Sequence, residues 1–161
     1  MPSEPGAAKC RSLSYEKGDE PNETSMPAEG ARYSLSFEQR GGFVCWAGMN
    51  LASAFAVSAN KHPEKIALFW GEKEYSYAHL WDEGVLVSDR VKSQFGVKPG
   101  DRVGLWLKNC PEFVPVFFGI LHAGAVVVPI NNFLKPAEVN FILQDAGINL
   151  LITDKELGAH F

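Results

Sequence analysis

Two polar segments follow apolar, strand-like runs, which is where a parallel α/β sheet binds its ligands. Lys108-Asn109-Cys110-Pro111 follows the run 102–107, and Pro129 to Phe133 (PINNF) follows the run 125–128. Lys108 and Asn109 therefore lie where a ligand contact is expected, because such sheets bind ligands at the carboxyl ends of their strands. A role for Asn109 at the start of the next helix explains that residue at least as well.

The sequence motifs that usually bind phosphate are missing from both segments. A dinucleotide-binding turn needs GxGxxG between a strand and a helix, and neither 108–111 nor 129–133 contains a glycine. The chain also has no GxxxxGK[ST] sequence and no GxSxG turn around a nucleophilic serine. Dinucleotide binding and P-loop chemistry are therefore disfavoured, and no catalytic or cofactor-binding residue is assigned.

The remaining reactive side chains form no recognisable cluster. Asp82 and Glu83 are neighbours on a predicted helix, where adjacent side chains do not face each other, so they are interpreted as solvated charges. The cysteines and histidines lack metal-ligand spacing. They are Cys10, Cys45 and Cys110, and His62, His79, His122 and His160. We expect reduced, space-filling thiols and no metal site, as in a reducing cytosol.

Composition and charge narrow the class of protein. Of the 161 residues, 46% are hydrophobic and 21% are charged, the balance of a globular protein with a packed core. The formal net charge of -4 argues against nucleic acid as a partner. The apolar stretch 43–57 is shorter than the roughly 20 residues that span a bilayer. It is interpreted as a buried or capping helix in a cytoplasmic protein, with peripheral contact to a membrane surface as the alternative.

The chain divides into two parts that differ in amino-acid composition and hydrophobic pattern. Residues 1–48 are rich in Pro, Gly, Ser and Glu and have few large apolar groups, so they are predicted to be a flexible N-terminal extension. The alternative is an arm that becomes ordered against the rest of a larger enzyme or against a partner subunit. Residues 49–161 form the second part, which carries regular hydrophobic patterns.

A helix and a hairpin are expected first in this second part. Asn50 can cap a helix that ends at His62-Pro63, since the residue before a proline avoids helical geometry. The runs 66–70 and 73–75 enclose a Gly71-Glu72 turn and predict a β-hairpin. Ser76 then caps a long helix to about residue 95, and close packing would explain Gly84 on its apolar line.

The remaining elements alternate in type. Strands are predicted at 102–107, 125–128 and 149–153, and helices at 111–123 and 136–146. This βαβαβ order with short connections predicts an α/β fold with a parallel sheet and helices on both faces. The strand 125–128 is expected to be buried on both faces. The helix 111–123 is apolar almost all round, so it should lie deep, between the sheet and other parts of the protein.

The stretch from Gly100 to Asp154 resembles the N-terminal subdomain of acyl- and aryl-CoA synthetases, which belong to the adenylate-forming superfamily. Residues 50–63 and Tyr75 to Leu80 (YSYAHL) resemble that family's opening helix and first core motif. Leu121 to Gly124 (LHAG) and Val128 to Asn131 (VPIN) resemble its second core motif, with a histidine at 122 where lysine is common. The order and spacing of these pieces agree over residues 50–154.

The resemblance implies a two-step reaction, in which a carboxylate attacks the α-phosphate of ATP and CoA then displaces AMP. It implies ATP, Mg²⁺ and CoA for the full-length enzyme, and none of them bound to this chain. In the family, the Ser/Thr/Gly-rich phosphate loop, the nucleotide contacts and the catalytic lysine lie beyond residue 161. The chain is accordingly expected to be a truncated part of a larger adenylating domain, and no catalytic, cofactor or metal residue carries over.

The leading interpretation is an acid–thiol ligase for a carboxylic acid, with a fatty acid favoured, whose 161-residue piece is inactive alone. The alternatives are a non-catalytic scaffold or interaction module from the same family, and an adenylation domain for an amino or aryl acid. A cut face on the isolated chain would expose apolar surface, so self-association is also expected.

Overall fold

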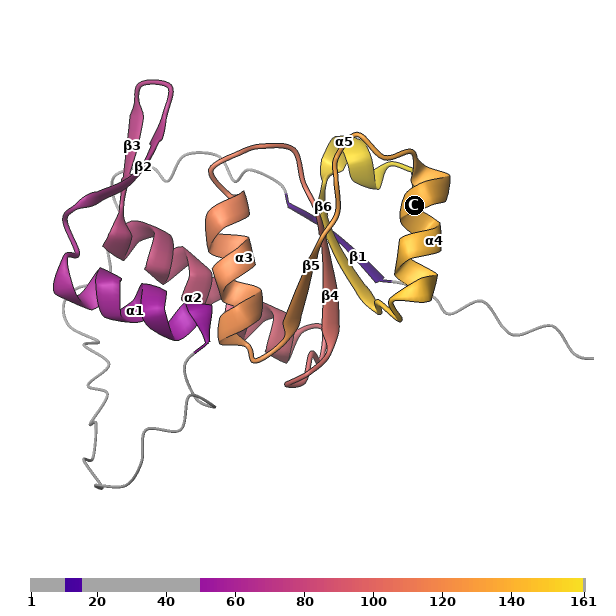
Figure 1. Ribbon diagram of the computed structural model, residues 1–161, viewed down its shortest axis with the longest axis horizontal. Helices are drawn as coiled ribbons and strands as arrows, with labels where there is room; N and C mark the ends of the chain where they lie inside the picture. The colour runs from indigo at the N-terminus through magenta and orange to yellow at the C-terminus, as the bar shows by residue number, and fades with distance from the viewer. Residues whose placement is uncertain (1–10, 16–49, 161) are drawn as a thin grey trace, which may run out of the picture. The chain divides into compact units, whose positions relative to one another are not determined.

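The computed structural model describes residues 11–15 and 50–160, which form an α/β fold with one main sheet (Figure 1). The main sheet has the strand order β1-β6-β4-β5, and β2 and β3 form a separate hairpin. The strands are β1 (Arg11–Tyr15), β2 (Ile66–Trp70), β3 (Lys73–Ser76), β4 (Arg102–Trp106), β5 (Val126–Pro129) and β6 (Leu150–Asp154). The helices are α1 (Leu51–Lys61), α2 (Tyr77–Ser93), α3 (Phe113–His122), α4 (Pro136–Asp145) and α5 (Lys155–Gly158).

The two predicted helix caps are confirmed. The Oδ1 atom of Asn50 accepts a hydrogen bond from the backbone N–H of Ser53 at 2.9 Å, and α1 begins at the next residue, Leu51. The Oγ atom of Ser76 accepts from the N–H of His79 at 3.2 Å, and α2 follows directly. Each cap satisfies one of the N–H groups that a first helical turn leaves without an acceptor. The β2–β3 hairpin is also present, and its strands pair antiparallel.

The βαβαβ prediction is confirmed, because β4 pairs in parallel with both β5 and β6. Helices cover both faces of this sheet, with α3 on one side and α4 on the other (Figure 1). Val103 and Leu105 of β4 belong to the core cluster that contains Ile120 of α3. Trp106, on the opposite face, belongs to the cluster that contains Val139 of α4. Side chains of β4 therefore alternate between the two faces of the sheet and pack into two separate cores.

The expectation that residues 125–128 form a strand buried on both faces is wrong. β5 lies at the edge of the sheet, and β4 is its only hydrogen-bonded neighbour among the described strands. Val126 is 47% exposed, and the pattern along β5 is exposed at both ends and half-buried between. A run of β-branched residues occurs both in interior strands and in edge strands, so the hydrophobic pattern does not show how many neighbouring strands pair with it.

α3 is buried along one side, at Pro115, Val116, Gly119 and Ile120, and its other apolar side chains are partly buried, so it lies less deep than expected. α1 and α2 both contact α3. The rings of Phe55 on α1 and Phe118 on α3 stack at 4.3 Å between centroids. No large apolar residue of α3 is among those that are strongly exposed in the described part of the chain. The chain's own helices therefore cover much of the apolar surface of α3.

Two glycines allow α2 and α3 to approach closely. A Cβ atom on Gly119 would lie 2.6 Å from the carbonyl oxygen of Gly84 and 2.7 Å from Cβ of Val87. A Cβ atom essentially never approaches other atoms this closely, so only glycine fits at position 119 without a shift of the helices. A Cβ atom on Gly84 would lie 3.4 Å from the carbonyl oxygen of Pro115, an ordinary contact. The close packing expected at Gly84 is confirmed, and it depends on Gly119.

The N-terminal extension predicted at 1–48 includes one strand that the sequence did not indicate. β1 pairs in parallel with β6 over Arg11–Tyr15. Residues 1–10 and 16–49 lie outside the described residues, so the division at 48/49, the flexible extension and the first half of the stretch 43–57 stay predictions. Within the described ranges, no helix has the length and apolar character needed to cross a membrane.

Candidate functional site at the carboxyl edge of the sheet

The chain's path around β4 defines where a ligand would bind. From β4 the chain passes through α3 to β5 on one side, and then through α4 to β6 on the other side. The connections on either side of β4 thus run to opposite faces of the sheet (Figure 1). An open parallel sheet binds ligands in the crevice at such a switch of direction, outside the carboxyl ends of the strands. The candidate site is therefore the edge where β4 and β6 end.

Side chains of the protein itself occupy this edge. Lys108, two residues beyond β4, forms an ion pair with Glu156 on α5. The hydrogen bond to Glu156 raises the pKa of Lys108, so the ammonium stays protonated. Asp154, the last residue of β6, accepts the N–H of Leu157 at 2.7 Å through Oδ1 and caps α5. Its Oδ2 atom lies 3.5 Å from the backbone nitrogen of Lys108 and makes at most a weak contact.

The segment after β5 is held as a turn. The indole N–H of Trp106 donates to the backbone carbonyl of Asn131 at 3.2 Å. The Oδ1 atom of Asn131 accepts the N–H of Phe133 at 3.0 Å. Trp106 is 1% exposed, so this bond satisfies a buried donor. Asn131 therefore has a structural role here, while Phe133 is 88% exposed at the same edge.

Asn109 does not cap the following helix, and its contact with a ligand stays a prediction. α3 starts at Phe113 with Glu112 at its N-cap position, so Asn109 is too early in the chain to cap this helix. Burial, reinforced by Glu112, raises the pKa of the Cys110 thiol to about 11. The thiol is therefore protonated at neutral pH and is a poor nucleophile.

The cofactors implied by the resemblance do not fit this edge by itself. One oxygen of Asp154 accepts the backbone N–H of Leu157, and one oxygen of Glu156 accepts from Lys108. Lys108 is paired with Glu156, and both side chains are exposed. The described residues also contain no group of three or more His, Cys, Asp or Glu that could hold a metal ion. No catalytic step is therefore derived through Mg²⁺ or ATP on these residues.

The sequence placed Lys108 at this edge but missed Asp154 and Glu156. The available signal was an aspartate directly after an apolar strand and before Lys155-Glu156, which is a helix N-cap pattern. That pattern would have put the Asp154 carboxylate at the end of β6. No sequence pattern pairs Glu156 with Lys108, because the two are 48 positions apart and meet only in the folded sheet.

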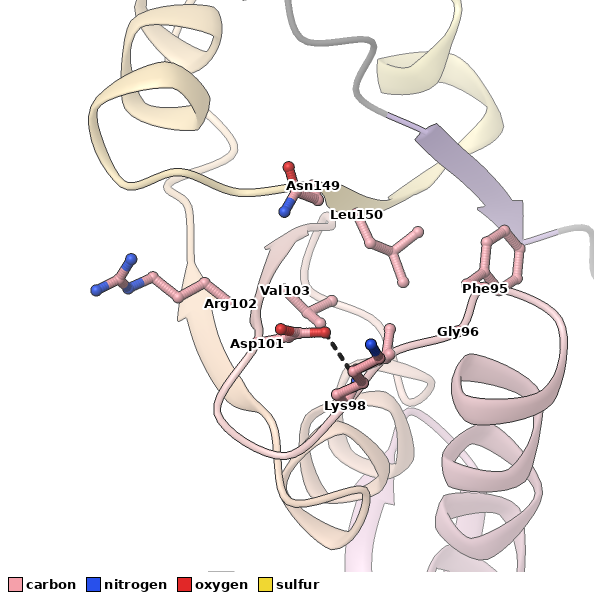
Figure 2. A pocket seen from close by; sticks show the side chains of 9 residues that line it. Phe95, Gly96, Lys98, Asp101, Arg102, Val103, Asn149 and Leu150 are labelled. Atoms are coloured by element: carbon pink, nitrogen blue, oxygen red, sulfur yellow. Dashed lines mark hydrogen bonds between the residues drawn. The ribbon is translucent and has the colours of Figure 1, made fainter.

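A cavity of about 300 Å³ lies at the opposite edge, around the start of β4 and β6 (Figure 2). Its polar side chains serve the local structure. Asp101 accepts the backbone N–H of Lys98 at 2.8 Å, and Arg102 donates to the carbonyl of Ala146 at 3.1 Å. Figure 2 shows the Arg102 side chain extending away from Lys98 and Asp101. The polar groups do not converge on a common point, so this cavity is not the better candidate.

Fold and site together define a doubly wound parallel α/β unit, and residues 11–15 and 50–160 alone place no complete nucleotide site at its carboxyl edge. A sequence model described as "AMP-binding enzyme" matches residues 55–160, which is more than half of the chain. The chain belongs to the AMP-binding enzyme family.

Curated relatives are similar over the same region. Crotonobetaine/carnitine–CoA ligase of Salmonella paratyphi A is 35% identical over 114 residues, which are 68% of this chain and 22% of the ligase. The protein of the same description from Salmonella enteritidis is 36% identical over 111 residues, 66% of this chain and 21% of the ligase. The chain thus spans about a fifth of the length of the curated relatives it matches.

Solved structures agree on the fold. The anthranilate CoA ligase AuaEII, in complex with anthranoyl-AMP, superposes with a TM-score of 0.66 and 32% identity over 70% of this chain and 22% of that one. The N-terminal domain of FACL13 from Mycobacterium tuberculosis gives 0.60 and 33% over 65% and 26%. The N-terminal subdomain of Klebsiella oxytoca NpsA gives 0.61 at 23% identity over 65% and 27%, which supports the fold alone.

Proposed function

We propose that this chain is part of an ATP-dependent acid–thiol ligase, which activates a carboxylic acid as an acyl-adenylate and transfers the acyl group to CoA. The observation that carries the proposal is the 35% identity to a CoA ligase over 114 residues, within the stretch matched by the AMP-binding family. ATP, Mg²⁺, CoA and the carboxylic acid are the partners of the whole enzyme in this proposal. Its location is proposed to be cytoplasmic, with peripheral membrane contact as the alternative.

In this proposal residues 50–160 act as a scaffold. The chain contributes a sheet whose two faces are covered by α3 and α4, and whose carboxyl edge at β4 and β6 carries the exposed Lys108–Glu156 ion pair. The groups that would stabilise charge on the phosphates are not among these residues, and charge stabilisation is the main requirement of the reaction. The 161-residue chain alone is therefore expected to form no acyl-adenylate.

The test is carboxylate-dependent exchange of pyrophosphate into ATP. We expect no exchange above background from the purified 161-residue chain. We expect exchange, and CoA-dependent release of AMP, from a protein that carries this sequence followed by the rest of an AMP-binding domain. Robust exchange by the 161-residue chain would contradict the proposal that these residues are a scaffold without the catalytic groups. A longer protein that folds and binds ATP but activates no acid would favour the alternative of a non-catalytic module.

The acid is proposed to be a fatty acid, and an aryl acid is the second candidate. The second candidate is supported by the structural similarity to AuaEII, whose structure contains anthranoyl-AMP. The same exchange assay, run on a panel of fatty, short polar and aryl acids, separates them through kcat/KM, because discrimination between substrates is a ratio of these values. A preference for an amino acid would instead indicate an adenylation domain of the peptide-synthetase type.

A further inference from the structure

We draw no further inference here: the strongest candidate, the surface patch formed by the exposed rings of Phe69 and Trp70 on the β2–β3 hairpin, carries nothing because nothing in the structure shows what covers it.

Discussion

The Cys110 thiol shows how the fold suppresses chemistry that the residue type would allow. Burial and the neighbouring Glu112 both favour the neutral thiol, which raises the pKa from 9.0 to about 11. Only the thiolate reacts with alkylating reagents. At pH 8 a thiol with a pKa of about 11 has about 100-fold less thiolate than a thiol with a pKa of 9.0, by the usual ionisation relation. Cys110 should therefore alkylate about 100-fold more slowly than an unperturbed thiol.

The measurement uses a Cys10→Ser, Cys45→Ser chain, in which Cys110 is the single thiol. The rate of alkylation by iodoacetamide, followed against pH, should reach its midpoint near the raised pKa and not near 9.0. Glu112→Gln removes the negative charge and should move the midpoint downwards. A midpoint at or below 9.0 in the intact fold would show that this thiol is not held in its protonated form.

His122 links stability to pH. Its ring lies edge-on to Trp81 at 5.0 Å between centroids. Burial lowers the pKa of His122, nearby Lys92 lowers it further, and Asp89 opposes this. Because the folded state binds the proton more weakly than the unfolded state, stability is fully present above the unfolded pKa of 6.5 and is lost as pH falls through the folded pKa.

The stability lost on acidification should therefore be smaller in a His122→Gln chain than in the natural one. Urea unfolding at pH 7.5 and at pH 5.0, performed on both chains, gives the two differences to be compared. The control is Lys92→Gln, which removes one of the groups that disfavour the imidazolium and should reduce the acid sensitivity in part. Equal losses in the natural chain and in His122→Gln would remove His122 as the source.

The crossing of α2 and α3 provides a matched pair of glycine substitutions. Gly119→Ala places a methyl group 2.6 Å from a backbone oxygen, so the helices must separate and the core between them is disturbed. We expect a loss of about 3 kcal/mol or more, at the upper end of overpacking effects. Gly84→Ala meets its nearest neighbour at 3.4 Å, and alanine favours the helix by about 1 kcal/mol, so its net effect should be close to zero.

Chemical denaturation of the two variants measures this difference directly. The same residue change on two facing helices controls for helix propensity, which would stabilise both. If Gly119→Ala were as stable as Gly84→Ala, the close approach of α2 and α3 would be wrong. Far-UV circular dichroism of Gly119→Ala distinguishes a weakened fold from a chain that does not fold.

Elements were predictable from sequence where a local signal sets them. The side chains of Asn50 and Ser76 cap the helices α1 and α2. Gly124 and Gly147 follow α3 and α4 with positive φ, and both helices end where the sequence predicted. The boundaries of β4 and β6 agree within one residue with the apolar runs. These features depend on residues three or four positions apart, which a sequence displays directly.

Features that depend on distant partners were not predictable. The pattern of β5 is β-branched like that of an interior strand, yet only one neighbour pairs with it. β1 has a short polar sequence, and its pairing with β6 spans more than 130 positions. At the candidate site, Lys108 was predictable because it directly follows a predicted strand. Its pairing with Glu156 was not, because that contact depends on the register between β4 and β6.

For the molecule as a whole, the two edges of the sheet differ in how they are protected. Among the described strands, β1 covers β6, and β5 has no partner on its outer side. β5 is only four residues long and ends at Pro129, which limits pairing with another strand. Its exposed side chains include Val126 rather than a charge, so the protection is incomplete.

The 161-residue chain is therefore expected to self-associate at high concentration. The large apolar residues that are exposed lie on several elements. They are Leu51, Val57, Phe69, Trp70, Leu86, Val126, Phe133 and Phe141. A net charge of -4 gives only weak repulsion between copies. We expect the weight-average mass in sedimentation equilibrium to rise with concentration, since both an open edge and apolar side chains favour contact.

Two substitutions distinguish association through the open edge of β5 from association through exposed apolar side chains. Val126→Lys adds a charge at the open edge and should reduce association if copies pair through β5, because lysine on an edge strand opposes strand pairing. Phe141→Ser removes a 69% exposed ring from α4 and should act only if apolar faces meet. We expect the larger reduction from Val126→Lys, since an edge offers directional hydrogen bonds as well as apolar contact. A natural chain that stays monomeric at millimolar concentration would show that the short β5 and Pro129 protect the edge sufficiently.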